Sequence, residues 1–159
     1  MASKAFFDPL VLLRLAPVVT STMAMRFSHD QSLFLRLFPG LNRANEIIPP
    51  YFKAFFTKGI WEIGALYTLT TATGISNIYV RPNTAWKWYA AGTAFAFFHM
   101  AFVPLIMYKI KALVDNEPKG QGLVSLREWL RVHKVRSWLA DVPAWACFMV
   151  ACLKSVQPI

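Results

Sequence analysis

Charged side chains are scarce in this sequence of 159 residues, of which aspartate, glutamate, lysine and arginine make up 16%, against about 25% in an ordinary soluble protein. Acidic residues are the rarer kind, eight against seventeen basic ones, which gives a formal net charge of +9. Apolar residues make up 56% of the chain, and the mean hydropathy is +0.39. Basic soluble proteins reach such a net charge with many more charges, so we do not expect nucleic acid as a partner.

Cysteines and phosphate-binding glycine motifs are also scarce. Cys147 and Cys152 lie five residues apart inside an apolar run, which is neither a disulfide framework nor a zinc-ligand spacing. The three histidines and the acidic residues show no helical metal-ligand spacing of three or four residues. We therefore expect no bound metal and no nucleotide cofactor.

Four long stretches contain almost no charge, and a helix that spans a membrane needs about 20 mostly apolar residues. The sequence predicts spans at about residues 10–27, 59–80, 86–108 and 138–154. Proline and glycine predict loops at Pro39-Gly40, Pro49-Pro50, Pro82 and Asn116–Gly122. The expected fold is all-α, an integral membrane four-helix bundle in which residues 1–159 form one domain and both termini lie on the same side.

Lysine and arginine predict the orientation of this bundle. The connection between the first two spans holds five basic residues, and the connection between the last two holds seven. The opposite side has four, namely Lys4, Arg81, Lys87 and Lys154. Both long loops should therefore face the cytosol, with the lipid bilayer of the endoplasmic reticulum or another endomembrane around the helices.

A few ionisable side chains fall within or next to the apolar runs, where an isolated charge is costly. Glu62 lies near the cytosolic end of the second span, and His99 lies midway along the third. Asp141 opens the fourth span, and His133 and Arg136 precede it. His29 and Asp30 follow the first span on the same side. We expect the three histidines, the two intramembrane acids Glu62 and Asp141, and Arg136 to converge in the cytosolic half of the bundle, although each can also be an interfacial ion pair or a plain loop residue.

The segment Leu126–Leu139 contains Trp129, three further residues, His133, two further residues and Arg136, followed by an apolar span. This pattern resembles the C-terminal signature of the anthrone oxygenases, small four-span membrane proteins of fungal polyketide biosynthesis. That family usually has asparagine at the position of His133. The stretches 55–59 and 102–107 are similar to its aromatic approach to a glycine and to its proline-containing helix end. Its polar Pro-Phe-Thr and Pro-Thr-Asn elements are absent here.

The resemblance implies a membrane-bound monooxygenase that oxidises an anthrone-like aromatic polyketide to a quinone with molecular oxygen, without a metal or flavin. Such chemistry needs a base with a pKa near neutrality, a donor for the developing oxyanion and a dry aromatic slot. His99 or His133 can be the base, and Arg136 the donor. Asp141 or Glu62 can orient a histidine. Four residues are candidates for contacts with a hydrophobic substrate: Trp129, Phe95, Phe98 and His29.

Two alternatives remain open. The run Pro49–Phe55, a span containing Glu62, and His99 with Pro104 are similar to sterol isomerases and the sigma-2 receptor, whose four-span bundles hold acids and a histidine in a sterol-sized cavity. That similarity implies proton shuttling on a sterol or terpenoid. A non-enzymatic scaffold is the third hypothesis. It would hold biosynthetic enzyme partners or anionic lipid through basic loop residues, namely Arg43, Lys53, Arg131 and Lys134.

Overall fold

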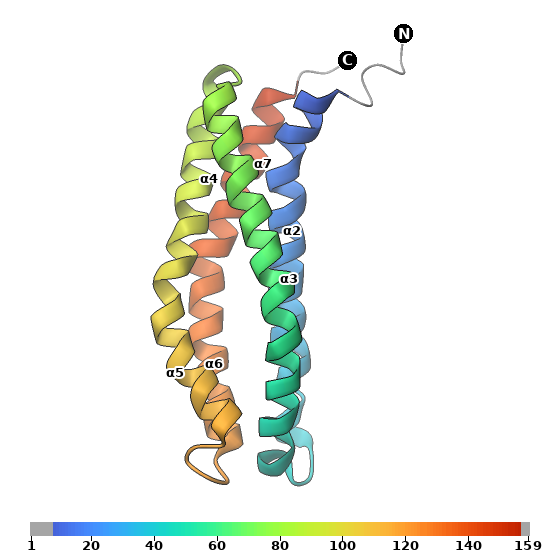
Figure 1. Cartoon of the computed structure of the whole chain (residues 1–159), viewed down its shortest axis with the longest axis vertical. Coiled ribbons are helices and arrows are strands. Elements are labelled where there is room, and N and C mark those ends of the chain that lie inside the picture. The colour runs from blue at the N-terminus through green and yellow to red at the C-terminus, as the bar shows by residue number, and fades with distance from the viewer. Residues whose placement is uncertain (1–7, 157–159) are drawn as a thin grey trace.

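The computed structural model describes residues 8–156, and all regular structure in this range is helical. The expected all-α class is confirmed, with four long helical segments arranged as an elongated antiparallel bundle (Figure 1). Short 3-10 turns, η1 (Phe38–Gly40) and η2 (Asn83–Ala85), lie in two of the connections. The first segment is α2 (Pro9–Leu35), and the second is α3 (Ala44–Val80). The third consists of α4 (Trp86–Phe98), η3 (His99–Phe102) and α5 (Val103–Asp115). The fourth consists of α6 (Gly122–Arg136), the π-helical η4 (Ser137–Asp141) and α7 (Val142–Ser155).

Helix α2 begins and α7 ends at the same end of the bundle, which we name the terminal end (Figure 1). The Arg14 guanidinium donates to the Ser155 carbonyl over 2.9 Å and ties the two helices together. The Tyr89 hydroxyl from α4 bonds to both Arg14 and Ser155 at 3.0 Å. The opposite end, named the loop end, holds the α2–α3 and α5–α6 connections. Lys4, one of the basic residues counted above, lies outside the described residues.

The helices extend well beyond the apolar runs that predicted them. The first continues to Leu35, and the second begins at Ala44. The loop expected at Pro49-Pro50 is therefore wrong, since both prolines lie within the first two turns of α3. This part of α3 is helical because Ile48 and Phe52 are buried on one face, a pattern that a search for uninterrupted apolar runs misses.

Three hydrophobic clusters lie along the bundle axis, and the smallest, made of Ala24, Leu66 and Tyr67, lies between two larger cores. The loop-end core is built from large side chains such as Phe52, Leu126 and Trp129. The terminal-end core packs Tyr89 and Phe148 among alanines. A Cβ added to Gly92 would lie 2.8 Å from the Phe148 ring, so the helices approach closely there. Small residues at helix contacts are typical of membrane proteins, where they let two helix backbones pack together.

Two helical segments within the described range are long and apolar enough to cross a membrane. They are Pro9–Gly40, with a mean hydropathy of 1.4, and Asn83–Asp115, with a mean hydropathy of 1.7. Only 17% and 28% of their most apolar windows are buried. Most of that apolar surface thus faces outward. The four-span arrangement itself stays a prediction.

Candidate active site

The fourth helical segment widens into a π turn, η4, at the junction between the two cores. Residues five apart in an α-helix lie about 140° apart around its axis, because each residue turns the chain by about 100°. The wider turn brings Asp141 back to the side of Arg136, five residues before it. Arg136 Nε lies 3.6 Å from Asp141 Oδ2. Single π turns in α-helices occur frequently at functional sites.

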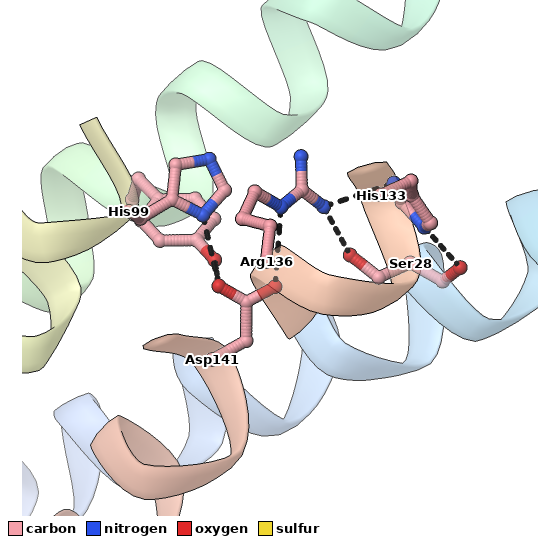
Figure 2. A network of polar contacts seen from close by, with 6 residues as sticks. Ser28, His99, His133, Arg136 and Asp141 are labelled. Carbon is pink, nitrogen blue, oxygen red and sulfur yellow. Dashed lines mark hydrogen bonds and ion pairs between the residues drawn. The ribbon is translucent and has the colours of Figure 1, made fainter. Parts of the chain in front are cut away.

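Asp141 is the centre of a buried polar network (Figure 2). Its Oδ1 accepts a hydrogen bond from the Tyr67 hydroxyl of α3 at 2.5 Å. The same oxygen lies 2.8 Å from Nδ1 of His99, at the start of η3. A carboxylate only accepts hydrogen bonds, so Nδ1 of His99 carries the proton. The side chains of His99 and Asp141 are only 8% and 3% exposed, which makes this an ion-pair geometry shielded from water.

The two rings held by Asp141 also contact each other. The Tyr67 and His99 ring centroids are 4.0 Å apart, with the planes inclined at 44°. Tyr67 and His99 come from α3 and η3, so the carboxylate joins three separate helical segments. With its Nδ1 hydrogen bond to Asp141 and its ring against Tyr67, His99 is fixed in one orientation. A histidine oriented by an acid is the arrangement that general acid–base chemistry needs.

Arg136 extends the network toward α2 (Figure 2). Its Nη2 lies 3.3 Å from the Ser28 hydroxyl and 3.1 Å from Nδ1 of His133. His133 Nε2 in turn lies 3.0 Å from the Ser28 carbonyl. A guanidinium only donates and a carbonyl only accepts, so these contacts fit a neutral His133 protonated on Nε2.

His133 belongs to α6, before the expected fourth span. Burial, and then the positive charge of Arg136 beside it, lower the pKa of His133 from its ordinary value of 6.5 to about 4. Both ring nitrogens are already hydrogen-bonded, so a substrate has no free nitrogen to meet there. The geometry gives His133 the role of holding Arg136 and α2 in place.

Trp129 supports His133 from the preceding turn of α6. The two rings stack, with centroids 4.7 Å apart and planes inclined at 19°. Phe52 of α3 packs edge-on against the same indole, at 5.3 Å. Trp129 is 4% exposed, so it is a core residue whose ring faces are both covered by protein. Its indole Nε1 has no hydrogen-bond partner.

A small cavity of about 80 Å³ lies on the His99 side of the network. Four residues with polar groups line it, together with apolar side chains including Phe56 and Ile106. The four are Gln31, His99, Trp129 and Arg136. Nε1 of Trp129 is buried without a hydrogen-bond partner, whereas Nε of Arg136 lies against Asp141 Oδ2 at 3.6 Å. His99 Nε2 makes no hydrogen bond to any residue between 8 and 156. One unpaired donor and one free imidazole nitrogen thus belong to residues that line a mostly apolar chamber.

A larger groove of about 490 Å³ lies on the α2 side of the network, between α2 and the α6–η4 segment. Ser28 and Asp141 belong to its lining, and His29 lies along it as an exposed side chain. Asp141 therefore reaches the groove while its partners His99 and Arg136 line the cavity. The polar network lies between the two spaces.

The structure brings together His99, His133, Arg136 and Asp141, four of the candidates expected to converge. The expected convergence is wrong for Glu62. Glu62 is exposed on α3 and forms no ion pair in the described part of the chain. Phe95 and Phe98 are 37% and 46% exposed on the outside of α4. Helix α4 is apolar all round, so its sequence does not show which face turns inward.

Sequence reasoning missed Tyr67 and Ser28, because neither carries a charge that stands out in an apolar run. A signal for Tyr67 exists in hindsight, since it is the tyrosine nearest the middle of the second span. Tyrosine hydroxyls usually find a partner when they are buried. In the described part of the chain, no group of three or more histidine, cysteine, aspartate or glutamate side chains is arranged to hold a metal ion.

Comparison with known proteins gives three informative relatives. Epoxidase pydX from Acremonium is 31% identical over 156 residues, which cover 93% of this chain and 96% of pydX. Epoxidase gkaX from Penicillium citrinum is 29% identical over 155 residues, covering 92% and 96%. Oxaleimides biosynthesis cluster protein N from Penicillium oxalicum is 24% identical over 161 residues, covering 93% and 92%. No model of a protein family matches the chain, and no solved structure matches it.

These relatives confirm the expectation of an oxidative enzyme of fungal secondary metabolism. None of these relatives is named an anthrone oxygenase, although the anthrone oxygenases are also oxidative enzymes of fungal secondary metabolism. The identity to pydX extends over nearly the full length of both chains. The chain belongs to the family of fungal epoxidases that includes epoxidase pydX.

Proposed function

We propose that this protein is a membrane-embedded oxygenase that converts a carbon–carbon double bond of a hydrophobic biosynthetic intermediate to an epoxide, with molecular oxygen as co-substrate. The observation that carries the proposal is the His99–Asp141 pair, held at 2.8 Å, whose histidine lines a mostly apolar cavity together with Arg136 and the unpaired indole N–H of Trp129. The epoxidase names of relatives that match over more than nine tenths of both chains support the reaction type.

Epoxidation by molecular oxygen has a fixed balance. One oxygen atom bonds to both carbons of the double bond, and the other leaves as water. Two protons and two electrons are consumed, and the electrons come from a reductase partner or from an oxidisable group of the substrate. We propose that the protein holds no cofactor of its own, so its side chains bind, orient and move protons.

Each residue at the cavity then has a separate task. His99 Nε2 delivers or accepts a proton at the reacting oxygen, while Asp141 and Tyr67 hold the ring and its tautomer. The unpaired N–H group of Trp129 donates to the oxygen as it becomes negative, and the positive charge of Arg136 stabilises the same oxygen. Donors fixed in a water-poor site stabilise such charge far better than water does, commonly by about 100-fold to 1000-fold in rate.

The bundle dimensions support placing this chemistry at a membrane surface. Helix α3 has 37 residues and is therefore about 55 Å long at about 1.5 Å per residue, whereas the hydrocarbon core of a bilayer is about 30 Å thick. We propose that all four segments span the membrane at the terminal end and that the loop-end core stands in the cytosol. The site then lies near the cytosolic interface of an endomembrane such as the endoplasmic reticulum.

The central test replaces His99. The variant His99→Gln in yeast microsomes should lower epoxide formation by at least about tenfold, because acid–base catalysis commonly contributes 100-fold or more. The assay supplies a polyene substrate, NADPH and ¹⁸O₂, and mass spectrometry detects the labelled epoxide. Expression and thermal unfolding of the variant are measured in parallel, so that loss of fold is distinguished from loss of chemistry.

Glu62→Gln is the matched control, since Glu62 is exposed and stands apart from the network. It should keep the activity of the unchanged protein. Equal turnover by the His99 and Glu62 variants would contradict the proposed site. Turnover without oxygen would favour the isomerase alternative. A protein in which no network residue matters, while Arg43 or Lys53 does, would favour the scaffold alternative.

Oxidation of an anthrone to a quinone is the second candidate, favoured by the same free His99 nitrogen facing an apolar chamber. A base there can remove a proton from the activated methylene carbon. This reaction turns CH₂ and O₂ into C=O and H₂O, so the substrate supplies all the electrons. The two reactions therefore differ in their need for a reductant. Quinone formation from an anthrone without NADPH would select this candidate over epoxidation.

A further inference from the structure

The groove between α2 and α6–η4 is large enough for a ligand of its own. Its volume of about 490 Å³ lies within the range of about 300–1,000 Å³ that is usual for small-molecule sites. A second hollow of about 340 Å³ adjoins it toward the loop end. Arg36 and Lys134 line both spaces, so the two form one continuous groove along α2 and α6.

The charges along this groove are almost all of one sign. Arg36, Lys134, Arg127 and Arg131 line it, and Asp141 is the single acidic residue in the lining. Asp141 is buried and already engaged by Tyr67, His99 and Arg136, so it does not neutralise the basic residues at the mouth. Arg36 and Lys134 are exposed and form no ion pair among the described residues.

The rest of the groove is mostly apolar. Met25, Leu33, Trp138 and Val142 contribute apolar surface, and three serines and His29 also line it. Ser137 Oγ is buried there without a hydrogen-bond partner. The groove thus offers cations at one end, a mostly apolar wall along its length, and an unpaired hydroxyl beside the catalytic network.

We infer that this groove binds an amphipathic organic acid, whose anionic head contacts Arg36 and Lys134 and whose apolar body lies toward Trp138 and Asp141. The groove and the cavity that His99 lines lie on opposite sides of Asp141, so this acid is a ligand held beside the catalytic network and is separate from the molecule that reacts at His99. A lipid phosphate shares the chemistry of the head group, and the crosslinking experiment distinguishes the two.

The test is photo-crosslinking, which measures binding independently of turnover. The purified protein in phosphatidylcholine vesicles is irradiated with an octadecenoic acid that carries a diazirine near its ninth carbon, or with its methyl ester. The labelled peptides are identified by mass spectrometry. The acid should label the peptides around Leu33–Leu37 and Ser137–Val142, and the ester should label them at least about tenfold less, because the ester lacks the charge-assisted contacts.

The double variant R36Q/K134Q should lose labelling by the acid to the level of the ester. The control K53Q/K58Q removes two exposed lysines from α3, outside the groove, and should change nothing. Labelling that is equal for acid and ester overturns the inference. Preferential labelling by a diazirine phosphatidic acid assigns the groove to a membrane lipid and overturns the assignment to an organic acid. Normal groove labelling with no epoxide formation would reject the proposed function and leave the anion site standing.

Discussion

Asp141 holds the site together, since one carboxylate contacts side chains from three other places in the chain. Tyr67 and His99 share its Oδ1, and Arg136 lies against Oδ2. Each of these partners presents an O–H or N–H group to the carboxylate, so the negative charge of this one residue holds all three partners in place. A buried charge with several donors is expensive to disturb, because removing it leaves those donors unsatisfied.

The substitution Asp141→Asn tests this role with almost no change in shape. The amide NH₂ cannot accept a hydrogen bond and must face either Arg136 or the pair Tyr67 and His99. We expect at least about a tenfold fall in epoxide formation and a loss of about 1–3 kcal/mol in stability. Turnover and thermal unfolding in detergent measure the two effects. Asp115→Asn, which removes an exposed acid paired with Lys111 at the loop end, should alter neither.

His133 predicts a dependence of stability on pH. Its pKa falls from 6.5 when exposed to about 4 in the fold, so the unfolded chain binds the proton first as the pH drops. Stability should be complete above about pH 7 and decline as the pH falls toward 4, by up to about 3 kcal/mol. Thermal unfolding in detergent between pH 4 and 7.5 measures the slope. The variant His133→Gln should show a shallower slope, and an unchanged slope would contradict the assignment.

The sequence revealed those site residues that carry or can carry a charge. His99 and Asp141 stood out because ionisable groups are rare in apolar helices. Tyrosine and serine occur often in membrane helices, so Tyr67 and Ser28 gave no such signal. Glu62 had the expected charge but lies on the wrong face. Depth along a helix can be read from the sequence, whereas the rotation of a uniformly apolar helix cannot.

At the scale of whole helices, the bundle packs differently at its two ends. In the terminal-end core, glycines of α3 and α4 allow close contact, and a Cβ on Gly74 would lie 2.4 Å from the Thr93 hydroxyl oxygen. In the loop-end core, aromatic rings fill the space between helices instead. Gly92 of α4 approaches Phe148 of α7 in the same way, so the contact between these two helices depends on the absence of a side chain at Gly92.

Gly92→Ala tests this dependence. The added methyl group would lie 2.8 Å from the ring of Phe148, which is fully buried. Overpacking of this kind costs about 1–3 kcal/mol, and each kcal/mol shifts the Tm of a chain of this size by roughly 2–4 °C. We expect a lower Tm in detergent. Gly64→Ala is the matched control, because nothing lies within 4 Å of its added methyl group; it should leave the Tm equal or higher.

At the scale of the whole molecule, the sequence predicted the number of helical segments, their order, and that the first helix begins at the end of the bundle where the last one finishes. It did not predict their lengths. The segments 28–35 and 44–58 are too polar to register as membrane spans, yet they bury Leu35 and Phe52 in the loop-end core. A search for uninterrupted apolar runs detects surfaces that face lipid, and it misses helices that are apolar on one face only.

The proposed topology can be tested by cysteine labelling. Lys119→Cys places a thiol in the α5–α6 connection, and Asn83→Cys places one in the turn between α3 and α4. In sealed microsomes, a membrane-impermeant maleimide should label the first and reach the second only after the vesicles are opened. Both variants carry Cys147→Ser and Cys152→Ser, which remove the two native thiols. Equal labelling of both sites in sealed vesicles would reject the four-span arrangement.

The π turn at Ser137–Asp141 has a consequence for how relatives of this protein are recognised. A π turn is equivalent to one residue inserted into an α-helix, so its removal leaves the flanking faces aligned. A sequence with Arg and Asp separated by three residues in a regular helix can present the same pair that Arg136 and Asp141 form across four. Two different sequence spacings can thus encode one site, and a search pattern for the family should accept a one-residue gap at this point.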